Sequence, residues 1–159
     1  MVDRDRANLS KSKGVFDMST VQRLNEITAN LGVLYAKLHQ HHFYVKGQEF
    51  YKLHELFETQ YNEVHEQFDQ VAERILMIGG KPVSTLGEFL ALATIKEAPY
   101  TTEKTGRQMV EETVADFELF RTQLEAAIRS DIDEVSQDLL IGMKAVYDKH
   151  LWTMKAYLG

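Results

Sequence analysis

Prolines occur only in the middle of this chain, and that placement constrains its fold more than any other feature. Pro82 and Pro99 are the only two prolines among the 159 residues. Because proline interrupts helices, the stretches before Pro82 and after Pro99 are free to form long ones. Both stretches are rich in helix-forming residues, and their apolar residues recur at spacings of three and four. There is no strand-like alternation and no internal repeat, so the sequence predicts an all-α fold.

The first two helices are predicted from their end signals. Ser19 and Gln22 form a capping box that opens the first helix, which runs to about Lys46. Gly47 then supplies the left-handed residue that ends it. The second helix is predicted over 49–77, where a pair of glycines and a proline follow.

A long connection separates this pair from two later helices. Residues 81–104 form it, and 88–93 is apolar enough for one or two helical turns. That length suits a crossover between non-adjacent ends of a bundle better than a tight hairpin. The third helix is predicted over 104–129, and Ser130 is placed to cap the fourth. The sum is a four-helix bundle with one long crossover that contains a short extra helix.

Each of the two later helices has one side that is predicted to be buried. Those sides carry Met109, Val110, Val114, Phe117, Phe120, Leu124 and Ile128 on the third helix, and Leu139, Leu140, Met143, Val146, Tyr147, Leu151, Met154 and Tyr157 on the fourth.

Length and composition suit one domain. Residues 1–17 are polar and lack periodicity, so we expect a flexible tail there and a bundle domain over 18–159. The chain has no cysteine, which excludes thiolate catalysis and cysteine-based metal sites. It shows neither a signal-peptide core nor a membrane-length apolar run, so we expect a soluble, cytoplasmic protein with no membrane partner. The net charge of −6 argues against a mainly electrostatic nucleic-acid binder.

Two carboxylates and an imidazole–carboxylate pair lie on the second predicted helix at metal-ligand spacing. Asp69 and Glu73 stand at i and i+4, so both project from one face. They repel each other unless a cation or a basic partner lies close, and a solvated acidic face is the alternative interpretation. His54 and Glu58 repeat the spacing, a pairing that suits Fe(II), Mn(II) or Zn(II).

Three histidines cluster at the end of the first predicted helix. His39 and His42 lie at i and i+3 on one side, whereas His41 points elsewhere. A lone histidine there is more often structural, but three together, with another soon after on the next helix, favour a metal site. His65 and His150 are isolated, and we interpret them as surface or hydrogen-bonded histidines.

The distance between the histidines and the pair of carboxylates, Asp69 and Glu73, decides whether they can form one metal site. If 50–77 is one helix, His54 and Asp69 are about 22 Å apart, too far for a single ion to contact both within one chain. Either the two groups are unrelated, or a second copy brings its Asp69 and Glu73 to His42 and His54. The chain has no Glu-x-x-His pair, which argues against an intrachain di-iron centre. A twofold axis near the middle of the helix produces two equivalent sites per dimer.

Four motifs stand out together: His39-Gln40-His41-His42-Phe43-Tyr44-Val45-Lys46-Gly47, Leu53-His54-Glu55, Asp69-x-x-Ala72-Glu73-Arg74 and Gly79-Gly80-x-Pro82-x-x-Thr85. In these motifs, and from about residue 30 to its end, the chain closely resembles the Dps proteins, the DNA-binding proteins from starved cells or mini-ferritins of the ferritin-like superfamily. The resemblance implies a ferritin-like bundle that assembles as a hollow homododecamer. It also implies oxidation of Fe(II), preferentially with hydrogen peroxide, storage of Fe(III) oxide in the cavity, and protection of DNA from oxidative damage.

The same resemblance implies a ferroxidase centre at the twofold dimer interface. Its iron ligands are then His42 and His54 from one subunit and Asp69 and Glu73 from the other, with Glu58 as an accessory ligand.

One residue departs from the family pattern. Members usually carry tryptophan directly after the histidine that matches His42, and here the residue is Phe43. An indole can hydrogen-bond a water at the site and donate an electron to quench a radical, whereas phenylalanine does neither. Tyr44 or Trp152 are the candidates to take over electron donation.

The family also draws iron through acidic pores at its threefold axes. Asp131, Glu134 and Asp138 match that region approximately. Favourable placement of acids near a helix N-terminus explains the same residues without a pore.

DNA binding through a basic tail is a further family property. Residues 1–16 contain four basic and two acidic residues, a balance of +2, so twelve tails could hold DNA non-specifically at low salt. A rival hypothesis is therefore a nucleoid protein that mainly binds and compacts DNA, with little oxidase activity. A third is a bundle that serves only as an interaction module.

Overall fold

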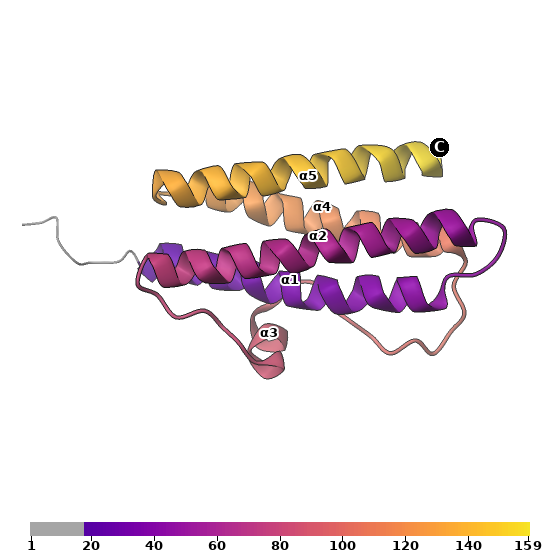
Figure 1. The fold of residues 1–159 in the computed structure, drawn as a ribbon, viewed down its shortest axis with the longest axis horizontal. Helices are drawn as coiled ribbons and strands as arrows, with labels where there is room; N and C mark the ends of the chain where they lie inside the picture. Colours follow the sequence, from indigo (N-terminus) through magenta and orange to yellow (C-terminus); the bar gives the residue numbers. More distant parts are fainter. Residues whose placement is uncertain (1–17) are drawn as a thin grey trace, which may run out of the picture.

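The structure, a computed structural model, describes residues 18–159, and the predicted tail over 1–17 lies outside the described residues. Within that range the chain is all-helical, with no strand (Figure 1). Its helices are α1 (Met18–Tyr44), α2 (Phe50–Met77), α3 (Leu86–Leu92), α4 (Gly106–Ile128) and α5 (Glu134–Leu158).

The four long helices pack as two antiparallel hairpins, α1 with α2 and α4 with α5 (Figure 1). The segment between α2 and α4 carries α3 and returns the chain from one end of the bundle to the other, so α2 and α4 run in the same direction. α3 packs against α1 on the outside of the bundle. The predicted four-helix bundle with one long crossover and a short extra helix is confirmed.

The end signals of the first hairpin are partly confirmed. α1 begins at Met18, so Ser19 lies inside the helix and is not its N-cap, and α1 ends at Tyr44, two residues before the predicted end. Gly47 has φ +101°, a region that side chains avoid, as the turn requires. α2 begins at Phe50, one residue later than predicted, and ends at Met77 as predicted.

The predicted cap of the last helix is wrong. Ser130 donates its hydroxyl hydrogen to the carbonyl oxygen of Ala127 at the end of α4, 2.6 Å away. Asp133 caps α5 instead, accepting from the backbone N–H of Ser136 at 2.9 Å and from Arg74 of α2 at 2.6 Å. Burial opposes ionisation of Asp133, but the hydrogen bonds from Ser136 and Arg74 outweigh it and lower the pKa of its carboxyl group. The N-terminal end of α5 is thus connected to α2 through Asp133 and Arg74.

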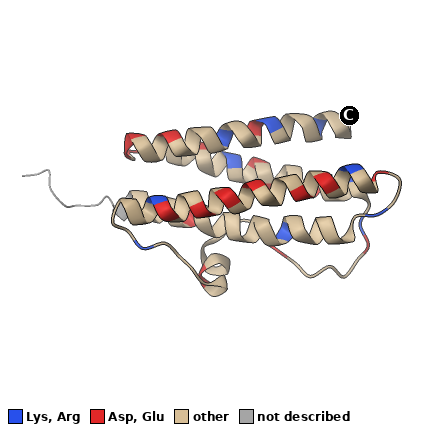
Figure 2. Cartoon of the chain, in the orientation of Figure 1, with Lys and Arg blue, Asp and Glu red and all other residues tan. Residues whose placement is uncertain are grey.

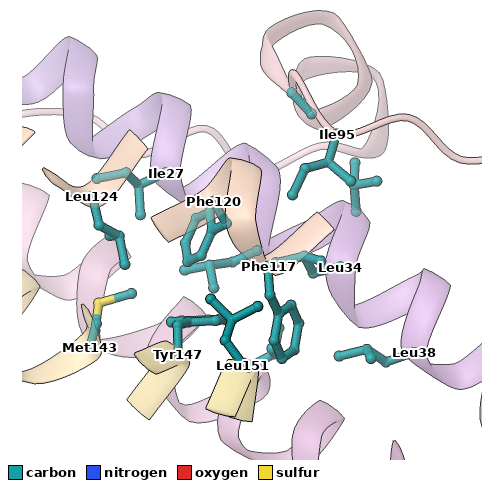
Figure 3. Packing of buried hydrophobic residues seen from close by; sticks show 14 of the residues in the cluster. Ile27, Leu34, Leu38, Ile95, Phe117, Phe120, Leu124, Met143, Tyr147 and Leu151 are labelled. Atoms are coloured by element: carbon teal, nitrogen blue, oxygen red, sulfur yellow. The ribbon is translucent and has the colours of Figure 1, made fainter. Parts of the chain in front are cut away.

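All four long helices contribute to the core, and Figure 3 labels residues of α1, α4 and α5 within it. Phe117 and Phe120 each meet the ring of Tyr147 edge-on, with centroids 4.8 Å apart. The hydroxyl group of Tyr147 donates to the side-chain oxygen of Gln67 on α2, so this buried polar group has a partner. Most of the predicted buried residues of the later helices are buried, but Ile128, Leu139 and Val146 are only half-buried. The prediction is wrong for Tyr157, which is exposed near the end of α5.

The two faces of α2 differ sharply. The buried face carries Leu53, Phe57, Gln60, Val64, Gln67, Val71 and Ile75, at the spacing of a helix stripe. The opposite face carries the carboxylates, which are spaced along the part of α2 turned toward the viewer in Figure 2. In the part of the chain that the structure describes, no helix covers that face.

Buried Asn30 of α1 holds the crossover. Its side-chain oxygen accepts from the backbone N–H groups of Thr94 and Ile95, each at 3.0 Å. Its amide nitrogen donates to the hydroxyl oxygen of Thr94 and to Gln123 of α4. Every hydrogen-bonding position of this buried amide is therefore used. No helix among the described residues is long and apolar enough to cross a membrane.

Candidate metal centre

His42, His54 and Glu58 come together at the hairpin between α1 and α2. Each offers one ligand atom, and the three atoms lie within 4.8 Å of one another. His42 belongs to the last turn of α1, and His54 and Glu58 occupy successive turns at the start of α2. The short turn between the helices makes them antiparallel neighbours, and it thereby brings His42 beside His54. The imidazole rings are stacked, with centroids 3.6 Å apart.

Backbone carbonyl groups orient both rings. Nδ1 of His42 lies 2.9 Å from the carbonyl oxygen of His54, and Nδ1 of His54 lies 2.9 Å from that of His42. A carbonyl oxygen only accepts, so each Nδ1 must carry the hydrogen. Each neutral ring then keeps its lone pair on Nε2, the atom left to bind a metal ion.

Glu58 completes a mixed donor set. It is exposed, and within the described chain no hydrogen bond or ion pair engages its carboxylate. Two imidazole nitrogens and one carboxylate oxygen suit a borderline divalent cation such as Fe(II), Mn(II) or Zn(II). Three ligands leave coordination positions open, so the group can accept further ligands or a substrate from outside the chain.

Asp69 and Glu73 are not part of this group within one chain. Both are exposed on α2, and α2 is continuous from Phe50 to Met77, so Asp69 lies about 22 Å along the helix from His54. Arg74, which follows Glu73 directly, is engaged by Asp133 and Ser136. The two carboxylates thus have no basic partner among the described residues, which leaves a cation or a solvated face as explanations.

The remaining histidines of the α1 cluster take other roles. Nδ1 of His39 donates to the carbonyl oxygen of Tyr35 at 2.8 Å, and the His39 ring stacks on Tyr61 at 3.8 Å. His41 points away from His39 and His42, as predicted, and it is buried in the bundle with 2% of its surface exposed. Burial, only partly opposed by Glu112, lowers the pKa of His41 to about 4, so this ring is neutral at neutral pH.

The two isolated histidines are not in the candidate centre. His65 is exposed, and His150 pairs with Glu63 of α2. These placements agree with the prediction that both are surface or hydrogen-bonded residues.

Tyr61 is the neighbour of the centre that sequence reasoning missed. Its ring meets His42 edge-on, with centroids 5.2 Å apart. A signal was present, because Tyr61 lies at i+3 from Glu58 and i+7 from His54, on the same helix face. Burial, then the charge of Glu58, raises the pKa of its phenol group.

Phe43 lies beside His42, whereas the two aromatic residues predicted as electron donors lie elsewhere. Phe43 is 69% exposed, and its ring centroid is 6.0 Å from that of His42. Tyr44 stacks on Tyr100 of the crossover at 3.9 Å, away from both site histidines. Trp152 of α5 is 70% exposed and makes no ring contact with any described residue.

The acids considered for a pore gather near the start of α5. Asp131, Glu134 and Asp138 are all exposed, and Glu134 is the first residue of α5. Asp138 also lines a hollow of about 400 Å³ between α2 and α5, together with Glu63 and Glu66. One chain provides no threefold axis, so the pore stays a prediction.

Comparisons with known proteins show the family and the fold of this chain. A family model described as a ferritin-like domain matches residues 21–159. The DNA protection during starvation protein of Listeria innocua is 45% identical over 150 residues, which cover 92% of this chain and 96% of the relative. The solved structure of Dps from Listeria monocytogenes has a TM-score of 0.86 and 47% identity, covering 88% of this chain and 93% of that one. Dps from Listeria innocua soaked with cobalt gives the same TM-score and identity, covering 88% and 92%.

Proposed function

The chain belongs to the Dps family of ferritin-like proteins, and from that premise we propose that it is a ferroxidase that oxidises Fe(II) and stores Fe(III) oxide inside a hollow shell. Hydrogen peroxide is the preferred oxidant, and oxygen is the alternative. The observation that carries the proposal is the three-residue group of His42, His54 and Glu58, which each offer one ligand atom within 4.8 Å of the others and leave coordination positions open.

The site is completed by a second subunit. Asp69 and Glu73 lack a basic partner and lie on the uncovered face of the helix that carries His54 and Glu58. If a twofold axis crosses α2 near its middle, two copies of α2 pair antiparallel and each end of one faces the opposite end of the other. The partner's Asp69 and the partner's Glu73 then lie beside His42 and His54. Two equivalent centres form in each dimer.

This donor set favours the oxidised metal. Carboxylate oxygens are hard, negatively charged ligands and stabilise Fe(III) more than Fe(II), while the neutral imidazoles retain Fe(II) before the reaction. Two Fe(II) ions supply the two electrons that convert one hydrogen peroxide and two protons to two waters. Both reagents of hydroxyl-radical chemistry are consumed together, which protects nearby DNA.

Mixed shells test whether each site needs two chains. We propose co-expressing a His54→Ala subunit and an Asp69→Ala subunit with different tags and purifying shells that hold both. Each variant alone should lose peroxide-driven Fe(II) oxidation. In a one-to-one mixture, about a quarter of the sites draw intact histidines from one chain and intact carboxylates from the other, so activity should return to about that fraction.

A matched pair provides the control. His42→Ala and His54→Ala alter the same chain's contribution, so their mixture contains no intact site and should stay as inactive as the separate variants. Glu66→Gln changes an exposed carboxylate on the same helix outside the centre and should leave the rate unchanged. Activity that returns in the same-side mixture, or fails to return in the opposite-side mixture, contradicts the shared site.

The remaining family properties complete the proposal. The working assembly is a homododecamer in the cytoplasm, with acidic pores that contain Asp131, Glu134 and Asp138. The basic residues of 1–16 hold DNA weakly and without sequence preference. A gel-shift series over salt, with and without residues 1–16, tests the DNA contact, because counterion release makes such binding fall steeply as salt rises. Strong DNA binding by shells that fail to oxidise iron favours the rival hypothesis of a DNA-compacting protein.

A further inference from the structure

A continuous column of aromatic rings leads away from the candidate metal centre. His42 contacts Tyr61 edge-on at 5.2 Å, and Tyr61 stacks on His39 at 3.8 Å with an angle of 21° between the rings. His39 in turn meets Tyr35 at 4.4 Å. Tyr35 is 39% exposed, so the column runs from a metal-binding imidazole to the surface of the chain.

Tyr61 is the oxidisable residue of this column that lies next to the metal ligands. Among the described residues it is the one tyrosine in ring contact with His42 or His54. Tyr51 is a step further away, because it contacts Phe50, which stacks on His54. Phenylalanine is far harder to oxidise than tyrosine, since it has no hydroxyl hydrogen to lose with the electron, and Phe43 therefore cannot take this role.

The surroundings of Tyr61 favour loss of an electron together with a proton. The ring of Tyr61 lies between two imidazoles, edge-on to His42 and stacked on His39. No described residue accepts a hydrogen bond from its hydroxyl group. The O–H group is thus available to a reactive oxygen species formed beside Glu58.

We propose that Tyr61 supplies the second reducing equivalent when only one Fe(II) occupies the centre. This inference rests on the proposed ferroxidase function. A single Fe(II) gives hydrogen peroxide one electron, which cleaves the O–O bond and leaves hydroxide and a hydroxyl radical. Transfer of the hydroxyl hydrogen of Tyr61 converts that radical to water. In sum, Fe(II), hydrogen peroxide and the tyrosine yield Fe(III), hydroxide, water and a neutral tyrosyl radical.

The stacked rings then stabilise and restore the residue. The unpaired electron is held against His39 and can pass to Tyr35, away from the metal ligands, so the histidines that bind iron are spared from oxidation. A later Fe(II) returns an electron to the tyrosyl radical, which takes up a proton and becomes tyrosine again, while that iron becomes Fe(III). The column thus takes the electron-donating role for which Phe43 is unsuited.

Freeze-quench electron paramagnetic resonance tests the assignment on the full chain. Shells receive less than one Fe(II) per site under anaerobic conditions and are then mixed with hydrogen peroxide. The wild-type protein should give a tyrosyl radical signal, and Tyr61→Phe, which keeps the ring and its stacking, should lower that signal at least several-fold. A spin trap in solution should report correspondingly more hydroxyl radical from the variant. Tyr44→Phe, the matched control outside the column, should resemble wild type in both measurements.

A second measurement separates this inference from the proposed function. At two or more Fe(II) per site the irons supply both electrons, so Tyr61→Phe should oxidise iron at the wild-type rate. Normal oxidation with no tyrosyl radical in wild type, or with an undiminished signal in Tyr61→Phe, overturns the role of Tyr61 and leaves the ferroxidase standing. Failure of the wild-type shell to oxidise iron with peroxide overturns both.

Discussion

At the scale of single residues, burial and orientation decide what each histidine does. His42 and His54 donate from Nδ1 to each other's carbonyl groups and so leave Nε2 to bind a metal ion. His41, the residue before His42, points into the core, and neither of its ring nitrogens has a hydrogen-bond partner. Neighbouring positions in one helical turn therefore serve a candidate metal site and the bundle core.

His41 makes the stability of the bundle depend on pH. Its pKa falls from 6.5 in the unfolded chain to about 4 in the folded chain. Between these pH values the unfolded chain binds a proton that the folded chain does not, so stability falls as the pH is lowered from 6.5 toward 4. That change in pKa corresponds to a loss of about 3 kcal/mol.

The His41→Gln variant tests this dependence, because glutamine does not titrate. We expect its free energy of unfolding, measured by denaturant titration from pH 7 to pH 4, to fall less steeply than that of the wild type. His65→Gln, which changes an exposed histidine of α2, should keep the wild-type slope. Equal slopes for His41→Gln and wild type contradict the assignment.

At the scale of helices, the periodic apolar residues determine where each helix lies, while contacts between helices decide how it ends. The bounds of α2 and α4 agree with the sequence prediction to within two residues. The cap of α5 differs from the prediction. Asp133 takes that position because it accepts from the N–H of Ser136 in α5 and also forms an ion pair with Arg74 of α2.

The two candidate caps of α5 differ in their expected effect on stability. Asp133→Ala removes the acceptor of the Ser136 N–H and the ion-pair partner of Arg74, so we expect a loss of about 1–2 kcal/mol. Ser130→Ala removes only a hydroxyl bond to Ala127 and should cost less. Thermal unfolding of both variants measures the difference, and a larger loss for Ser130→Ala would restore the cap that the sequence predicts.

Asn30 is expected to control the crossover in the same way. Asn30→Ala leaves the N–H of buried Ile95 without its acceptor, which should cost about 2–3 kcal/mol. Hydrogen exchange should accelerate at residues 94 and 95. Asn25→Ala provides the matched control, because Asn25 binds the start of the crossover at Lys81 and Val83, so exchange should change there and not at 94–95.

At the scale of the whole molecule, one chain leaves much apolar and acidic surface without cover. Exposed large apolar side chains include Leu76, Met77, Leu86, Leu90, Val135, Ile141 and Trp152. The outward face of α2 carries carboxylates that no described base neutralises at Asp69 and Glu73. The proposed symmetric assembly accounts for both features, because subunit contacts would cover the apolar side chains and the proposed metal sites would use the carboxylates.

The assembly has a mass that a single experiment can check. Twelve copies of the 18.3 kDa chain weigh about 220 kDa, and we expect size-exclusion chromatography with light scattering to report that mass. Loading with Fe(II) and peroxide should leave the mass of the protein shell unchanged while iron co-elutes with it. A monomer or simple dimer would instead favour a bundle that serves only as an interaction module.

The sequence by itself determined the all-helical bundle, the crossover and the pairing of His42 with His54. These depend on local physics: apolar periodicity places the helices, proline and glycine end them, and a short turn makes consecutive helices neighbours. Tertiary structure decided that Tyr61 lies against His42, that Asp133 caps α5 and that Asn30 holds the crossover. Those contacts join residues of different elements, so they depend on how the packed helices orient their side chains. Spacing along α2 indicates only that Tyr61 shares a face with His54 and Glu58. The distance of about 22 Å between His54 and Asp69 follows from the rise of a continuous helix, so the sequence predicts it and the structure has it. Because the helix is rigid, only the Asp69 of a second chain can come close to His54.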